Sequence, residues 1–105
     1  MPVSYWVYDP EYYEPINDKA YYGAKYTLKE ELQVDGLSAC VKAFCTPEDN
    51  NIGYVTEGYI AFVVHPDGTE EPAYVLKDGR VKPQSSPGAA KSIALKALES
   101  AAKAA

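Results

Sequence analysis

The sequence predicts an α+β fold, in which an antiparallel meander of about four strands has a C-terminal helix packed across it and a shorter helix near residues 37–45. Three observations lead to this prediction. Strand-favouring residues gather between turn signals, most clearly over residues 54–65. Apolar residues recur at helical spacing over residues 37–45. An alanine-rich run with high helix propensity covers residues 89–104.

Length and composition predict one domain over residues 1–105. A chain of 105 residues has the usual size of one domain, and no stretch of it resembles a linker. Hydrophobic residues make up 47% and charged residues 24%, which is the balance of a globular protein and not of a disordered chain. The chain is therefore expected to fold around a single core.

The first predicted strand covers residues 3–8, where every residue except Ser4 favours a strand. Asp9 and Pro10 end it. The chain from there to residue 20 contains Pro15 and has neither a helical nor a strand period, so it is predicted to be an ordered loop.

Residues 26–34 carry conflicting signals. Apolar residues alternate toward Asp35-Gly36, which predicts a strand that ends in a hairpin turn. Thr27 followed three residues later by Glu30 instead fits a capping box that opens a short helix. Both interpretations of this segment stay open.

The shorter predicted helix covers residues 37–45. Its five apolar residues recur at i, i+3, i+4, i+7 and i+8, which would place them on one helical face: Leu37, Cys40, Val41, Phe44 and Cys45. Asp35 is available as the N-cap, and Pro47 closes the segment.

Residues 54–82 are expected to complete the meander. Residues 54–65 form a predicted strand, and residues 65–68, His-Pro-Asp-Gly, turn the chain. Residues 73–77 form another predicted strand, which returns over residues 80–82 after the hairpin signal Asp-Gly.

The C-terminal helix has the clearest signals. Ser86 can cap it, and Pro87 fits the first helical position because its missing N–H is not needed there. A polar side gathers at helical spacing: Ser92, Lys96, Glu99, Ser100 and Lys103. The opposite side is broad and made of small residues, so the helix is expected to approach the sheet closely: Ala90, Ile93, Ala94, Ala97, Leu98 and Ala101.

Charge and hydropathy exclude several classes of partner. The net charge of −5 opposes direct binding to nucleic acid or to an anionic membrane. The longest apolar run, residues 59–64, is far too short to cross a bilayer, and the N-terminus lacks the features of a secretory signal. The expected location is the cytoplasm, or the host cytoplasm for a viral protein. Cys40 and Cys45 are expected to be buried thiols there.

No arrangement of residues predicts catalysis, a metal or a cofactor. His65, the single histidine, has no nucleophile or orienting carboxylate signalled beside it. The Cys-x4-Cys spacing lacks the close pairing of a zinc site. The acidic pair Glu70-Glu71 is interpreted as solvated, and we expect a protein that is not an enzyme.

The segment over residues 8–18 is the predicted binding site. It mixes tyrosines with acidic residues in a proline-bounded loop, which can offer aromatic anchors surrounded by negative charge to a basic groove. The predicted partner-binding residues are Asp9, Glu11, Tyr12, Tyr13, Glu14 and Asp18. The alternative is a loop whose tyrosines pack back onto the domain.

The C-terminal quarter resembles part of a known family. Gly79-Arg-Val-Lys-Pro83 leads through Ser86-Pro-Gly into the alanine-rich helix, and this build is similar to that of some small phage-encoded anti-CRISPR proteins. No functional residue of that family matches a position here. The resemblance implies a single-domain inhibitor that binds a CRISPR–Cas protein or complex and does no chemistry.

The expected function is that of a small acidic binding protein. It would inhibit a nucleic-acid-handling complex of the CRISPR–Cas type by occupying a basic site on a protein or ribonucleoprotein. The alternative is a self-associating structural or assembly component, for example of a phage particle, that uses exposed tyrosine-rich strands.

Overall fold

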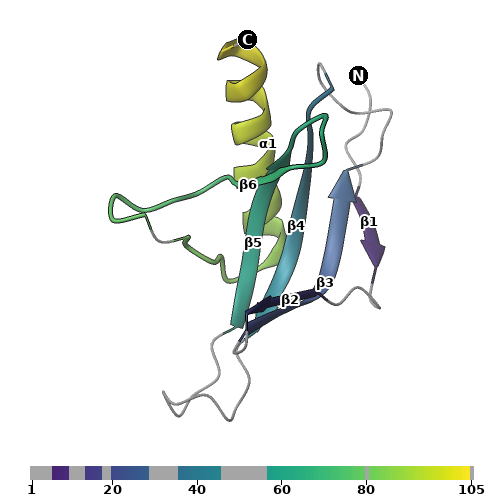
Figure 1. Ribbon diagram of the computed structural model, residues 1–105, viewed down its shortest axis with the longest axis vertical. Helices are drawn as coiled ribbons and strands as arrows, with labels where there is room; N and C mark the ends of the chain where they lie inside the picture. The colour runs from purple at the N-terminus through teal and green to yellow at the C-terminus, as the bar shows by residue number, and fades with distance from the viewer. Residues whose placement is uncertain are drawn as a thin grey trace.

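The computed structural model describes residues 6–9, 14–17, 20–28, 36–45, 57–79 and 81–104. Within these ranges the elements in chain order are β1 (Trp6–Asp9), β2 (Glu14–Asn17), β3 (Ala20–Leu28), β4 (Ser38–Cys45), β5 (Glu57–Val64), β6 (Glu70–Pro72) and α1 (Pro87–Ala104). Figure 1 shows α1 lying along one side of a twisted sheet.

The strands form one antiparallel sheet in the order β1-β3-β4-β5-β6. β2 pairs with the other end of β3, and since β4 occupies one edge of β3, β1 and β2 share the opposite edge. The predicted α+β class, antiparallel sheet and C-terminal helix are confirmed. The described part of the chain holds six strands where about four were predicted.

The helix predicted over residues 37–45 is wrong, because this segment forms strand β4. β4 lies in the middle of the sheet and is covered on both faces. Ala39 and Val41 lie on the face of the sheet that α1 covers, while Cys40 and Phe44 lie on the opposite face. A strand buried on both faces carries an almost continuous apolar run, and such a run also satisfies helical spacing.

Two apolar clusters hold the sheet. The larger one lies between the sheet and α1 and contains Leu28, Ala39, Val41, Ala61, Ala90, Ala94 and Leu98. The smaller one, on the opposite face, contains Cys40, Ile60 and Phe62. Ala90 and Ala94 are fully buried, so the small face of α1 does allow the close approach that the sequence predicts.

α1 begins as predicted. The Ala89 N–H donates to Ser86 Oγ at 3.2 Å, which satisfies one of the free N–H groups of the first turn. Ser92, Lys96, Glu99 and Ser100 are exposed, in agreement with the predicted polar side. No helix in the described ranges has the length and hydropathy that a bilayer span requires.

The strand predicted over residues 73–77 is replaced by a projecting arm, which we define as residues 74–79 and 81–82. The chain leaves the edge of β5 where the Ala73 N–H donates to the Ala61 carbonyl at 2.9 Å, and it returns where Gln84 and Tyr59 exchange backbone bonds of 2.9 and 2.7 Å. Between these points, Val75 and Val81 form a single bridge. In Figure 1 the arm extends away from the sheet on the side opposite β1.

Glycines form the two predicted turns. Gly68 ends the turn over residues 65–68 and Gly79 ends the arm's turn, each with a φ of 89° that favours glycine. Gly58 has another role, because a Cβ at this position would lie 2.6 Å from Pro83 Cβ. The base of the arm therefore packs directly on the backbone of β5.

The N-terminal predictions are tested in part. β1 lies in the predicted strand over 3–8 and extends it to Asp9, and residues 3–5 lie outside the described ranges. The predicted loop to residue 20 contains β2, which pairs with β3. Of the ambiguous segment 26–34, the described residues 26–28 belong to β3 and are therefore strand.

Candidate protein-binding surface

The structure describes two of the six predicted partner-binding residues. Asp9 is the last residue of β1 and its side chain is exposed. Glu14 is the first residue of β2. The other four lie outside the described residues: Glu11, Tyr12, Tyr13 and Asp18.

The two ends of the predicted segment are attached to the same strand edge. Asp9 pairs with Lys25 of β3, and Glu14 pairs with Tyr22 of the same strand. These β3 positions are three residues apart, which corresponds to about 10 Å along a strand. Residues 9 and 14 are therefore held on one edge, close to each other.

Aromatic side chains line this edge on the face that α1 covers. The Tyr8 and Tyr26 rings stack with their centroids 4.7 Å apart at an interplanar angle of 27°. Lys91 Nζ of α1 lies 4.8 Å from the centroid of the Tyr26 ring and 5.6 Å from that of Trp6. These cation–π contacts join the helix to the edge of the sheet. Burial, with the nearby Tyr8 and Tyr59 phenols, raises the pKa of Tyr26 above 10.0, so its ring stays neutral at physiological pH.

Although Tyr8 stacks on Tyr26, much of it faces solvent. Its side chain is 53% exposed and that of Val7 is 42% exposed. Because successive side chains of a strand point to opposite faces, Val7 and the exposed Asp9 lie on one face of β1 and Tyr8 on the other. We call these three consecutive residues the β1 edge (Val7, Tyr8 and Asp9). Of the residues gathered at this edge, Asp9 belongs to the predicted binding residues, while Trp6, Val7, Tyr8 and Lys91 do not. Trp6 and Tyr8 come close to Tyr26 because β1 pairs with β3 in this register.

A charged cluster lies on the face of the sheet opposite α1. Lys42 on β4 is only 2% exposed, and its Nζ contacts Glu70 Oε1 on β6 at 2.5 Å. Lys25 Nζ lies 3.4 Å from the other oxygen of the same carboxylate. Lys42 Nζ also lies 5.2 Å from the centroid of the Phe62 ring. Glu70, predicted to be solvated, thus joins β6 to two inner strands.

Cys40 belongs to the same cluster. Its Sγ lies 3.6 Å from Glu70 Oε2, and the thiol is fully buried. Burial and the negative charge of Glu70 raise the pKa of Cys40 to about 12. Because the thiolate is the reactive form, Cys40 is suited to packing and not to nucleophilic catalysis.

The buried thiol gives a direct prediction. In a Cys45→Ser variant, which leaves Cys40 as the remaining cysteine, we expect reaction with a thiol reagent at pH 8 to be at least about 1,000-fold slower than for the unfolded chain, since the native thiolate is that much rarer and is also inaccessible. Absorbance of the released chromophore measures the rate in buffer and in denaturant. Equal rates in both conditions would contradict the buried position of Cys40.

His65 has a carboxylate beside it after all. Its Nε2 lies 2.8 Å from Glu71 Oε2, but Glu71 is 67% exposed and the pair lies at the surface. Among the described side chains, no three His, Cys, Asp or Glu residues come together as metal ligands would.

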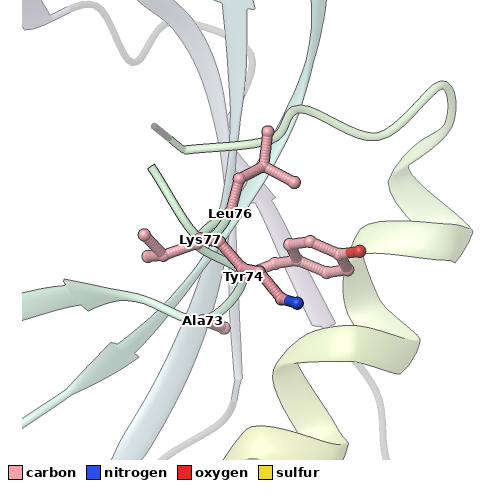
Figure 2. Close-up of a pocket in the computed structure, with 5 residues that line it drawn as sticks. Ala73, Tyr74, Leu76 and Lys77 are labelled. Carbon is pink, nitrogen blue, oxygen red and sulfur yellow. The ribbon is translucent and has the colours of Figure 1, made fainter. Parts of the chain in front are cut away.

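The hollows in the described surface are shallow. One is lined by five consecutive residues, Ala73 to Lys77. Figure 2 shows that their side chains point in different directions instead of converging, with Leu76 and the Tyr74 ring directed apart. Another, bordered by His65, Glu71 and Ala97, lies where α1 meets the strand ends. Neither has the enclosed shape that binds small ligands.

Comparison with known proteins finds no matching family model, no matching curated protein and no matching solved structure. Its function is therefore inferred from the chain's own geometry and charge.

Proposed function

We propose that this protein works by binding a basic surface of another protein or ribonucleoprotein through the β1 edge and the adjoining acidic segment to residue 18, without catalysing a reaction. The most specific version of this proposed function, which the anti-CRISPR resemblance implies, is the inhibition of a CRISPR–Cas complex in the cytoplasm. A protein of this kind would occupy a groove that otherwise holds nucleic acid.

The observation that carries the proposal is the exposed Tyr8 on an anchored edge strand, which exposes Asp9 on its other face. Tyr8 is held by its stack on Tyr26 and by β1–β3 pairing, so little side-chain entropy is lost when a partner covers it. Tyrosines in such positions are frequent binding hot spots.

Charge supports a basic partner. The chain carries a net charge of −5, and the segment after Tyr8 adds Asp9, Glu11, Glu14 and Asp18 within ten residues. Such a field attracts a basic groove and repels nucleic acid itself. The inert Cys40 thiol and the exposed His65–Glu71 pair offer little support for an enzyme instead.

Binding to purified CRISPR–Cas effector complexes tests this proposal. We expect at least one complex to bind the full chain, with affinity that falls about tenfold or more when salt is raised from low to physiological levels and beyond. Tyr8→Ala and Asp9→Lys should each weaken binding about tenfold or more. Interferometry with the immobilised chain measures both effects. Tyr12→Ala, or reversal of the charge at Glu11 and Glu14, extends the test to the rest of the segment.

Two matched controls are available. Tyr74→Ala removes another exposed tyrosine, 41% exposed against 53% for Tyr8. Glu99→Lys makes the same charge change as Asp9→Lys on the exposed side of α1. Both should bind like the wild type. Equal losses for the controls and the β1-edge variants would reject this surface, and no binding to any complex would reject the CRISPR–Cas target.

A further inference from the structure

We infer that the open face of the Tyr8 ring is a platform on which an arginine side chain of the partner stacks. This inference rests on the proposed function, because it names the residue type through which a basic partner would bind the β1 edge. Three aromatic rings gather on one face of the β1–β3 edge: Trp6, Tyr8 and Tyr26. Trp6 and Tyr8 share this face because they are two residues apart on β1.

One face of the Tyr8 ring is covered and the other is open. The Tyr8 and Tyr26 rings are stacked with their centroids 4.7 Å apart, so Tyr26 lies against one face of Tyr8. Tyr8 is nevertheless 53% exposed, whereas Trp6 and Tyr26 are half-buried. Since the covered face contributes little to that exposure, a flat aromatic surface remains open to solvent on a ring that is fixed from behind.

The same group of rings already holds a cation. Lys91 Nζ on α1 lies 4.8 Å from the centroid of the Tyr26 ring and 5.6 Å from that of Trp6, both within the range of a cation–π contact. Among the described residues, no cation is placed over the Tyr8 ring in this way. Tyr8 is therefore the ring of the three that remains available to a cation from another molecule.

Charge favours a cation over the other groups that stack on aromatic rings. A nucleotide base would bring phosphate charge with it, which the net charge of −5 repels. A neutral aromatic side chain would gain nothing from the same field. The negative field and the electron-rich ring face both attract a cationic side chain.

The flat ring face also distinguishes arginine from lysine. A guanidinium group is planar and weakly hydrated, so it can lie flat on the Tyr8 ring while its N–H groups stay free to donate at their edges. A lysine ammonium is compact and strongly hydrated, and it loses more hydration in the same position. The net charge attracts both residue types, whereas the stack favours arginine.

NMR titration of the full chain with three peptides tests this inference. The probes are blocked pentapeptides of glycine with arginine, lysine or citrulline at the centre, and citrulline keeps the planar shape without the charge. We expect the arginine peptide to bind about threefold more tightly than the lysine peptide, and the citrulline peptide to bind most weakly. The ring protons of Tyr8 should shift, and the δ-methylene protons of the arginine should move upfield because they lie over the ring.

Variants of Tyr8 separate the ring from general attraction. Tyr8→Phe keeps the ring and should keep the preference for arginine, while Tyr8→Leu should abolish the preference by weakening the arginine peptide about threefold. Tyr74→Leu is the matched control, because Tyr74 is also exposed, at 41%, and should leave the preference unchanged. Added salt should weaken both charged peptides and leave their ratio nearly constant. Unfolding curves establish that each variant is folded.

Several results would overturn the inference. Equal binding of the arginine and lysine peptides would do so, and so would a preference that persists in Tyr8→Leu. Tyr8 shifts that depend on protein concentration without peptide would assign the ring to a second copy, and stronger binding of adenosine monophosphate would assign it to nucleic acid. Equal binding of both basic peptides would still leave the proposed basic partner in place. Failure to bind any CRISPR–Cas complex would reject that target and leave the arginine preference standing.

Discussion

Replacing Glu70 by glutamine is expected to lower the free energy of unfolding by about 2 kcal/mol. The substitution keeps the size of the side chain and removes the charge that compensates Lys42, which is 2% exposed. Breaking a fully buried ion pair from one side costs about 3–5 kcal/mol, and we expect less here because Glu70 is 25% exposed. Denaturant unfolding at pH 7 measures the difference.

A second substitution separates the ion pair from simple packing. Lys42→Met together with Glu70→Gln removes both charges and keeps apolar contact with Phe62, so the double variant should be more stable than Glu70→Gln alone. Glu71→Gln is the matched control, because Glu71 is the next residue and is 67% exposed. A loss from Glu70→Gln no larger than the control's would contradict the role of the pair.

The same pair predicts a pH dependence. Burial alone would raise the pKa of Glu70, but hydrogen bonding and charge from Lys42, together with Lys25, outweigh it and hold the pKa below 4.5. A lowered pKa in the folded state means that the ionised carboxylate stabilises the fold above pH 4.5 and that this stabilisation is lost as the pH falls through the folded value. The difference between wild type and Glu70→Gln should therefore shrink as the pH falls below 4.5.

Elements with local signals could be predicted from the sequence. The cap at Ser86, Pro87 and the alanine spacing lie within one helix, and α1 forms as predicted from them. The turn at Gly68 also depends on neighbouring residues alone. β4 could not be recognised, because its burial on both faces comes from α1 and from strands elsewhere in the chain, and this burial removes the alternation that marks a strand.

The charged cluster and the β1 edge depend on distant pairing in the same way. Lys42 and Glu70 are 28 residues apart, and nothing local distinguishes Glu70 from its solvated neighbour Glu71. Tyr8 meets Tyr26 because β1 pairs with β3 in a particular register. Composition predicted a binding site in the stretch that contains Asp9, and this stays a prediction, while the attachment of Asp9 and Glu14 to β3 depends on strand pairing that composition does not indicate.

The other large effect is expected on the α1 side of the sheet. Leu98→Ala should lower the free energy of unfolding by about 3 kcal/mol, because Leu98 is 3% exposed and packs in the cluster with Val41 and Ala61. Ala90 and Ala94 lie on the same face and are too small to fill the space that the missing side chain leaves. Thermal and denaturant unfolding measure the loss.

Leu95→Ala, on the same helix, makes the identical chemical change at a half-buried position outside that cluster. Helix propensity changes equally in the two variants, so the difference between them reports packing alone. We expect Leu95→Ala to cost less than half as much as Leu98→Ala. Equal losses would contradict the packing of Leu98 against the sheet. The helix would then have to lie on the sheet in a different orientation from the one that buries Ala90 and Ala94.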